Sequence, residues 1–227
     1  MDLKEAIAAR HSVRSYVPRP LSVTSAAELE RLIAEYNEKS GLRLQLVKDE
    51  PKAFDSRRGR LAFAKYGRFA GVTNYIALVG KKSPDFEEKC GYYGELLVLE
   101  ARRMGLDTCW VGLTYKKIPD AFTVESDEKL LGVIALGYGV NHGKERKSKS
   151  PTAIAPQYDT APDWFKKGID GVLLAPTAVN QQKFTFTLDG DKVIAKAGVG
   201  FYTRTDLGIA KCHFEICSDR DESVWKS

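Results

Sequence analysis

Residues 10–14 read Arg-His-Ser-Val-Arg, and they lie between a short amphipathic start and a pair of prolines. Proline stops a helix and pushes the residue before it towards extended geometry, so we expect this segment to be extended. Successive side chains of an extended segment point to opposite faces, which puts Arg10, Ser12 and Arg14 on one face. Two guanidinium groups and a hydroxyl suit a phosphate dianion, whose oxygens accept charge-assisted hydrogen bonds. The alternative is a solvated edge with two ordinary surface arginines.

Length and composition limit the classes of protein to which this chain can belong. The 227 residues suffice for one large domain with a substantial core. The net charge of +5 is mild, and no dense basic helix is present, so we expect no nucleic-acid partner. There is no apolar signal segment and no bilayer-spanning run, so we expect a cytoplasmic protein without a membrane partner. The four cysteines form no CxxC pair and no ligand spacing with histidine, so we expect reduced thiols and no metal site.

Local patterns predict the elements of the N-terminal half. The pairs Asp2/Glu5 and Ser25/Glu28 have capping-box spacing, which predicts helices that end near residues 9 and 37. Alternating leucines predict a strand at 42–47, and a nearly all-apolar run predicts a strand covered on both faces at 74–80. Between them, residues 49–70 are charged and loop-like, with aromatic residues at Phe63, Tyr66 and Phe69.

A largely apolar helix is expected at residues 91–105. Its Glu95 is interpreted as an acid of the first turns, favoured by the helix dipole. Buried strands are expected at 109–113 and 130–139, and the alternation of strands with helices indicates an α/β or α+β sandwich.

The composition becomes polar and basic after residue 139. This stretch is either a solvated linker or a second anion-binding arm, and nothing in the sequence pairs with its His142. A helix at 160–174, a hairpin at 184–197 and a helix at 206–218 follow. We expect His213 of the last helix to be packed or capping rather than catalytic. Residues 175–182 read Ala-Pro-Thr-Ala-Val-Asn-Gln-Gln, a loop with polar groups suited to a heteroaromatic ligand.

Several common catalytic motifs are missing from the sequence. It contains no GxGxxG after a strand, no P-loop, no HExxH and no nucleophile elbow. No set of Ser, His and Asp stands out either. A bound cofactor therefore fits better than chemistry by side chains alone.

Four segments resemble the FMN-dependent nitroreductase family. Residues 6–16 (AIAARHSVRSY) resemble its N-terminal signature, and residues 175–182 resemble its Ala-Pro-Ser-x-x-Asn-x-Gln motif. Residues 91–112 look like its central helix and following strand, and residues 134–147 look like its terminal strand and phosphate arm. In the usual family order the Asn/Gln motif follows the Arg-Ser-Arg motif within a few tens of residues. Here it lies near position 180, which suggests a divergent branch with a rearranged or duplicated C-terminal part.

The resemblance implies an α+β fold, a three-layer sandwich whose central mixed or antiparallel sheet is flanked by helices. FMN would lie at a dimer-type interface, so a homodimer is expected. We predict a single nitroreductase-like domain over residues 1–227. Its core would be 1–139, a basic linker arm 140–160, and a helix-hairpin-helix part at 161–227 would complete the flavin site.

The resemblance also assigns roles to residues. Arg10 and Ser12 would bind the FMN phosphate, and Arg14 would lie near the pyrimidine edge, where a cation stabilises the reduced flavin. Gly112, together with Val111, would offer backbone contact at N5, since glycine permits close approach. Arg14 and Gly112 are thus the predicted catalytic residues. The other predicted cofactor contacts are His11, the basic arm residues Lys144, Arg146 and Lys147, and the loop residues Pro176, Thr177, Asn180 and Gln182. In this family such loop residues often come from the partner subunit.

The implied activity is an FMN-dependent oxidoreductase. It would take hydride from NADH or NADPH and reduce a small-molecule acceptor, such as a nitroaromatic, a quinone-like or another conjugated compound, in a ping-pong cycle. One alternative is a flavin-binding carrier or electron-transfer module without NAD(P)H turnover. Another is a structural or interaction domain that has lost the flavin.

Overall fold

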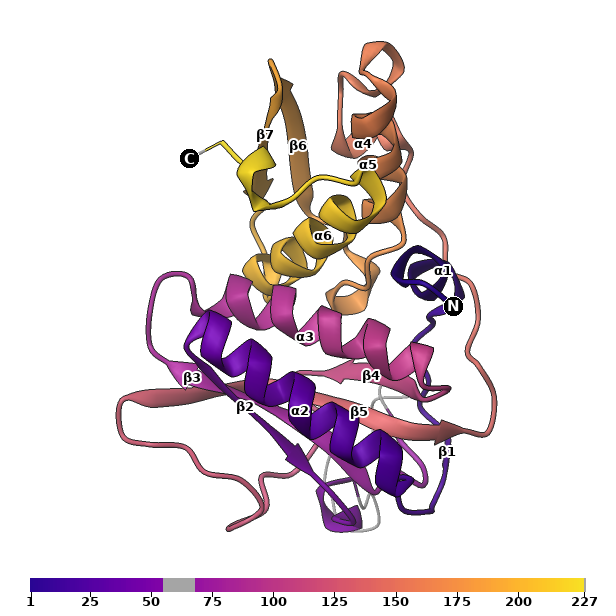
Figure 1. Cartoon of the computed structure of the whole chain (residues 1–227), viewed down its shortest axis with the longest axis vertical. Helices are drawn as coiled ribbons and strands as arrows, with labels where there is room; N and C mark the ends of the chain where they lie inside the picture. Colours follow the sequence, from indigo (N-terminus) through magenta and orange to yellow (C-terminus); the bar gives the residue numbers. More distant parts are fainter. Residues whose placement is uncertain (55–67, 227) are drawn as a thin grey trace. The chain divides into compact units, whose positions relative to one another are not determined.

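The computed structural model of the protein describes residues 1–54 and 68–226. The chain divides into two compact units that interleave along the sequence (Figure 1). The helical unit comprises Met1–Ala9, Glu87–Leu96 and Arg146–Ser227, and the sheet unit comprises Arg10–Phe86 and Leu97–Glu145. Phe63 and Tyr66 of the predicted aromatic cluster lie outside the described residues. The single domain over the whole chain stays a prediction.

The sheet unit is built around an antiparallel sheet. Its strands follow the order β1-β5-β3-β2, and β4 also pairs with β5. All four ladders between these strands are antiparallel. The strands are β1 (Tyr16–Val17), β2 (Leu42–Val47), β3 (Asn74–Lys81), β4 (Asp107–Val111) and β5 (Glu128–Gly139).

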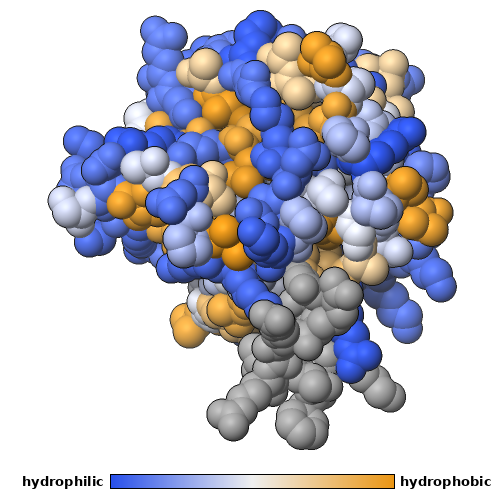
Figure 2. All heavy atoms as spheres, turned by 90° about the horizontal axis from the view of Figure 1, so that it is seen from below, coloured by the Kyte–Doolittle hydropathy of each residue, from blue (hydrophilic) through white to orange (hydrophobic). Residues whose placement is uncertain are grey.

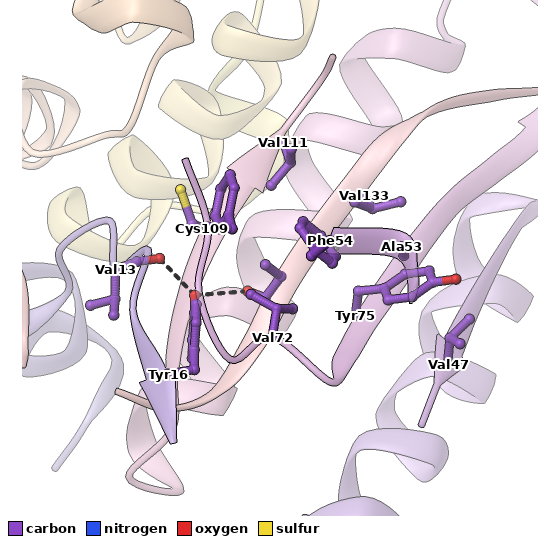
Figure 3. Packing of buried hydrophobic residues seen from close by; sticks show 12 residues of the cluster. Val13, Tyr16, Val47, Ala53, Phe54, Val72, Tyr75, Cys109, Val111 and Val133 are labelled. Carbon is purple, nitrogen blue, oxygen red and sulfur yellow. Dashed lines mark hydrogen bonds between the residues drawn. The ribbon is translucent and has the colours of Figure 1, made fainter. Parts of the chain in front are cut away.

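The apolar run in β3 explains its central position. Its first seven residues are all buried, which confirms the prediction of a strand covered on both faces. On one side, the rings of Tyr75 and Phe54 meet edge to face at 5.9 Å, within a larger cluster (Figure 3). The Tyr16 hydroxyl donates to the Val13 carbonyl oxygen at 2.7 Å, which satisfies its polar group inside this core.

Helix α2 (Val23–Ser40) begins earlier than the sequence suggests. Its N-cap is Ser22, whose Oγ accepts a hydrogen bond from the Ser25 amide at 3.0 Å, so the predicted capping role of Ser25 was wrong. The helix ends at Gly41, which adopts the left-handed conformation that favours glycine (φ 71°). A short 3-10 helix, η1 (Pro51–Phe54), follows β2.

Helix α3 (Phe86–Arg103) begins five residues before its predicted start at Gly91. Residues 87–96 belong to the helical unit, and residues 97–103 belong to the sheet unit. Gly91 is therefore an interior residue of this helix, and it was misread as a boundary.

The helical unit contains the predicted C-terminal elements with shifted ends. In α1 (Leu3–Ala9) the capping box forms as predicted: the Asp2 amide donates to Glu5 and the Glu5 amide donates to Asp2, both at 2.8 Å. The polar arm is not wholly a linker, because α4 and η3 interrupt it. The remaining elements are α4 (Pro151–Ile154), η3 (Tyr158–Thr160), α5 (Asp163–Leu173), η4 (Ala178–Asn180), β6 (Phe184–Asp189), β7 (Lys192–Ala197), α6 (Thr203–Ser218) and η5 (Glu222–Val224).

Aromatic rings form the core of the helical unit. Phe214 of α6 stacks on Phe186 of β6, with ring centroids 5.8 Å apart, and meets Phe165 of α5 at the same distance. The antiparallel hairpin β6-β7, which the Asp-Gly turn predicts, is thereby fixed to the helices.

The surface is mostly polar where it is visible. Hydrophilic residues cover much of the face in Figure 2, and hydrophobic residues lie between them in small groups. None of the helices within residues 1–54 and 68–226 combines the length and apolar character that a bilayer span requires.

The capping of α2 can be tested by two serine variants. Ser22→Ala should lower the free energy of unfolding by about 1 kcal/mol, because it removes the acceptor of an otherwise unpaired helix amide. Ser25→Ala should cost clearly less, because the bond uses the Ser25 backbone. Urea unfolding of both variants measures this, and an equal or larger loss in Ser25→Ala would contradict the assignment.

Candidate active site

The segment at residues 10–14 is not helical, as predicted. Ser12 forms a parallel bridge with Thr108 of β4, and the Val13 amide donates to the Thr108 carbonyl oxygen at 3.0 Å. The segment then continues into β1, which pairs with the end of β5. Backbone pairing with β4 therefore holds the segment extended beside the sheet.

Cys109 lies near three of the predicted flavin-binding residues. Burial raises the pKa of its thiol, whereas the charge of Arg14, a hydrogen bond with Ser12 and the charge of Arg10 lower it. All three side chains therefore lie close enough to Cys109 to affect the pKa of its thiol (Cys109 is labelled in Figure 3). The side chains of Arg10, Ser12 and Arg14 therefore lie in one neighbourhood, and their placement on a single face stays a prediction.

Arg10 is a buried cation, only 4% exposed. Water screens a charge in such a position poorly, so its interaction with any anion that reaches it is strong. The geometry thus provides a hydroxyl and two guanidinium groups, one of them shielded from solvent, which is the chemistry that a phosphate group requires.

Gly143 brings the basic loop of the sheet unit to this segment. It adopts φ 80°, and a Cβ there would lie 2.6 Å from the Cβ of His11 and 3.2 Å from the Ser12 carbonyl oxygen. Any larger residue would push the loop away from His11. The adjacent Lys144 is therefore carried by a loop that lies against the segment at residues 10–14.

Gly112 directly follows the end of β4 at Val111. The predicted strand at 109–113 is thus shifted towards the N-terminus. A Cβ on Gly132 of β5 would lie 2.8 Å from the Val111 carbonyl oxygen and 3.4 Å from the Gly112 Cα. The close packing of two backbones fixes the position of these two predicted flavin contacts.

Sequence reasoning missed Asp107, a buried acid at the start of β4. Its carboxylate accepts hydrogen bonds from Arg102 at 2.9 Å and from the Gly139 amide at 3.3 Å. The Nδ1 of His142 lies 3.1 Å from the same carboxylate, so the interpretation that nothing pairs with His142 was wrong. Asp107 therefore fixes the start of the basic loop. The sequence signal that could have identified it is an acidic residue at the first position of a buried strand.

In the helical unit, Arg146 and Gln182 bind their own chain. The Nη2 of Arg146 donates to the carbonyl oxygens of Ala175 at 2.5 Å and Leu173 at 3.3 Å, at the end of α5. Gln182 is 1% exposed, and its Oε1 accepts from the Lys149 amide at 2.8 Å. These bonds join the basic arm to the Asn/Gln loop.

The loop itself has an unusual backbone. Val179, Asn180 and Gln182 all have positive φ values of 45°, 57° and 44°. Such conformations cost free energy in residues other than glycine, and they persist only where surrounding contacts fix them. Here Asn180 donates to the Lys147 carbonyl oxygen at 2.8 Å, and the Gln182 amide donates to Thr177 Oγ1 at 3.2 Å.

Asp206 of α6 provides a further anchor for the loop. It is 2% exposed and accepts hydrogen bonds from the Ala178 amide at 2.9 Å and the Gln181 side chain at 2.7 Å. Burial raises the pKa of Asp206 to about 6, although these two bonds oppose the rise. The loop geometry therefore depends on a carboxylate that is costly to ionise.

The predicted site residues fall into two groups. The sheet unit holds Arg10, His11, Ser12, Arg14, Val111, Gly112 and Lys144, and the helical unit holds Arg146, Lys147, Pro176, Thr177, Asn180 and Gln182. Within each unit the structure connects members of the group. Their roles towards a flavin stay predictions.

Glu95 and His213 form a buried pair in the helical unit. Both are 0% exposed, and His213 Nε2 lies 3.0 Å from Glu95 Oε1, while Nδ1 lies 3.0 Å from the Gly171 carbonyl oxygen. The interpretation of Glu95 as a first-turn acid was wrong, because α3 begins at Phe86. The expectation of a packed His213 is confirmed. Among the described residues, no group of three His, Cys, Asp or Glu side chains could hold a metal ion.

Comparison with known families decides the identity of the fold. The sequence model of a family described as "Putative TM nitroreductase" matches residues 2–218. The chain belongs to this nitroreductase family. No curated protein sequence matches the chain. Membership confirms the resemblance noted in the sequence and makes the protein an oxidoreductase by family.

Solved structures show the same fold. A "putative nitroreductase" from Thermotoga maritima is 24% identical with a TM-score of 0.65, over 96% of this chain and 83% of its own. A "Putative NADH Oxidase" from Clostridium acetobutylicum is 20% identical with a TM-score of 0.50, over 66% of this chain and 96% of its own. A "Putative NADH dehydrogenase/NAD(P)H nitroreductase" from Bacteroides thetaiotaomicron is 18% identical with a TM-score of 0.51, over 67% of this chain and 95% of its own. The predicted α+β nitroreductase-like sandwich is confirmed.

The raised pKa of Asp206 predicts a pH-dependent stability. Between about pH 4 and 6 the folded nitroreductase binds more protons than the unfolded chain, so the free energy of unfolding should fall as the pH rises. A pKa change from 3.8 to about 6 corresponds to roughly 3 kcal/mol. Asp206→Asn should reduce this dependence of the free energy of unfolding on pH, which urea unfolding at pH 4, 5, 6 and 7 measures.

The matched control is Asp191→Asn, which changes an exposed acid in the turn of the β6-β7 hairpin. Its free energy of unfolding should depend on pH as strongly as that of the unchanged protein. Equal slopes in Asp206→Asn and the unchanged protein would show that this carboxylate is not the cause.

Proposed function

We propose that this nitroreductase is an FMN-dependent oxidoreductase. It takes hydride from NADH or NADPH and reduces a small conjugated acceptor, such as a nitroaromatic or quinone-like compound, in a ping-pong cycle. The observation that carries the proposal is the extended segment beside β4, which carries Arg10, Ser12 and Arg14 and buries the guanidinium of Arg10. Family membership supports the reaction class.

The donor set fits the phosphate of FMN. Arg10 offers a buried guanidinium, Ser12 offers a hydroxyl, and the loop held by Gly143 carries Lys144. A phosphate dianion would gain charge-assisted hydrogen bonds from the first two and a further favourable charge interaction from the lysine. His11 would contribute through its contact with that loop.

FMN, when bound, supplies the ability to accept a hydride and pass the electrons on. Arg14 provides a positive charge on the same extended segment, and we assign it to the pyrimidine edge, where it stabilises negative charge. Gly112 and Val111 provide backbone groups at the end of β4, and the missing side chain of Gly112 leaves room for close approach. Solvent can deliver the protons that a reduced acceptor needs.

The names of two structural relatives agree with a nicotinamide donor. One is named an NADH oxidase and the other an NADH dehydrogenase/NAD(P)H nitroreductase. For the helical unit, we assign Arg146 and Gln182 to holding the loop, since both bind it directly. Roles for Lys147, Pro176, Thr177 and Asn180 as flavin contacts rest on the family resemblance.

The visible spectrum of freshly purified protein tests the function. We expect flavin bands that bleach when NADH or NADPH is added without oxygen. Bands that persist would indicate a flavin carrier or a protein electron donor. If no bands appear even after FMN is supplied, the proposed function is wrong.

Arg10→Ala tests the phosphate assignment. It should weaken FMN binding by about 3 kcal/mol, or roughly 100-fold in Kd, because it removes a poorly screened cation. Fluorescence titration with FMN measures the change. Arg31→Ala, on the exposed side of α2, is the matched control and should leave Kd unchanged. Equal affinities in the two variants would remove Arg10 from the site.

Arg14→Ala tests the electrostatic assignment. It should lower the midpoint potential of bound flavin by tens of millivolts, since about 30 mV corresponds to 1.4 kcal/mol for two electrons. Arg14→Lys, which keeps the charge, should restore most of the potential. A spectroelectrochemical titration gives the values, with Arg19→Ala, which removes a guanidinium stacked on Tyr138, as control. An unchanged potential in Arg14→Ala would contradict the role.

A further inference from the structure

One buried carboxylate of the sheet unit joins three separate elements. The side chain of Asp107, at the start of β4, is 3% exposed. Its Oδ1 accepts a hydrogen bond from Arg102 Nη1, at the end of α3, at 2.9 Å, and its Oδ2 accepts one from the Gly139 amide, at the end of β5, at 3.3 Å. His142 Nδ1 lies 3.1 Å from Oδ2 and 3.4 Å from Oδ1. Because little water reaches this carboxylate, its interactions are screened less than those of an exposed acid.

The end of β5 is shaped for this contact. A Cβ on Gly139 would lie 2.5 Å from Asp107 Oδ2 and 2.5 Å from the Asn141 carbonyl oxygen, so a larger residue would push the carboxylate and the chain apart. The Val140 amide donates to the Ser15 carbonyl oxygen at 2.9 Å. The direction in which the chain leaves β5 is therefore set by the carboxylate on one side and by the N-terminal segment on the other.

The basic loop, residues 140–145, then returns to the predicted phosphate ligands. The Gly143 amide donates to Asn141 Oδ1 at 3.0 Å, which closes a tight turn. Beyond this turn Gly143 lies against His11 and the backbone of Ser12. A chain of contacts thus leads from the buried carboxylate through the loop to the phosphate-binding segment, and all of its members belong to the sheet unit.

We propose that Asp107, Arg102 and His142 are positioning residues that make the site prefer FMN over riboflavin. Arg102 balances the charge of the carboxylate, the carboxylate holds His142, and His142 keeps the loop that carries Lys144 beside Ser12. The proposal rests on the proposed function. Riboflavin lacks the phosphate that these ligands bind, so its affinity should not depend on the position of the loop.

Asp107→Asn tests the proposal by comparing two flavins. Fluorescence titrations at about pH 8, where a phosphate monoester carries two charges, should show FMN binding weakened by about tenfold. The Kd for riboflavin should stay within about twofold, because the isoalloxazine contacts are unchanged. An equal loss for both flavins would indicate a merely structural role and would overturn the proposal.

His142→Ala tests the same contact from the exposed side. The imidazole is 71% exposed, so its removal leaves no cavity in the core. FMN binding should weaken by about fivefold, and His142→Asn should restore most of it, because the Asn amide offers a donor near the position of Nδ1. Lys48→Ala, which removes a surface cation paired with the exposed Glu30, is the control and should change neither Kd. Equal affinities in His142→Ala and the unchanged protein would remove His142 from the set.

Amide hydrogen exchange of the flavin-free protein separates this proposal from the proposed function. In Asp107→Asn the amides of the basic loop should exchange faster, because the loop opens more often, whereas those of β2 should keep their rates. A protein that binds neither flavin and still shows this change would contradict the proposed function while confirming that Asp107 positions the loop. Unchanged exchange in the loop would overturn the proposal even in a protein that binds FMN.

Discussion

Strand β5 is the constraint on which the sheet unit depends. Over its twelve residues it pairs with β3, β4 and β1. Strand β4 in turn forms a bridge with the extended segment at residues 10–14, so the proposed phosphate ligands follow the position of β5 through β4. A rigid, buried strand can hold charged side chains in place without relying on their own flexibility.

Two buried carboxylates organise the loops that the sheet and helices leave free. Asp107 binds the Gly139 amide and His142 at the start of the basic loop, and Asp206 binds the backbone and side chain of the Asn/Gln loop. In both cases an acid on a regular element is bonded to a loop residue, which is His142 for Asp107 and Gln181 for Asp206. A buried carboxylate is costly unless it is fully bonded, so each loop is selected in one conformation.

Strong local patterns made much of the fold predictable. The apolar run of β3, the hairpin turn and the capping box at Asp2 each determine their own structure. Gly91 and Glu95 were misread because their environment comes from α6, more than a hundred residues later. For the same reason the partner of His142 was invisible. The extended backbone of residues 10–14 was predictable from the prolines that follow, whereas the proximity of its side chains to Cys109 depends on the pairing with β4.

The buried pair of Glu95 and His213 has a consequence for how the helical unit folds. Glu95 belongs to α3 and His213 belongs to α6, more than a hundred residues later, so neither helix can bury its polar side chain until the other is in place. An unpaired buried polar group costs free energy, so either helix packed without the other would be penalised. We therefore expect the two helices to form as one cooperative unit, aligned by this pair.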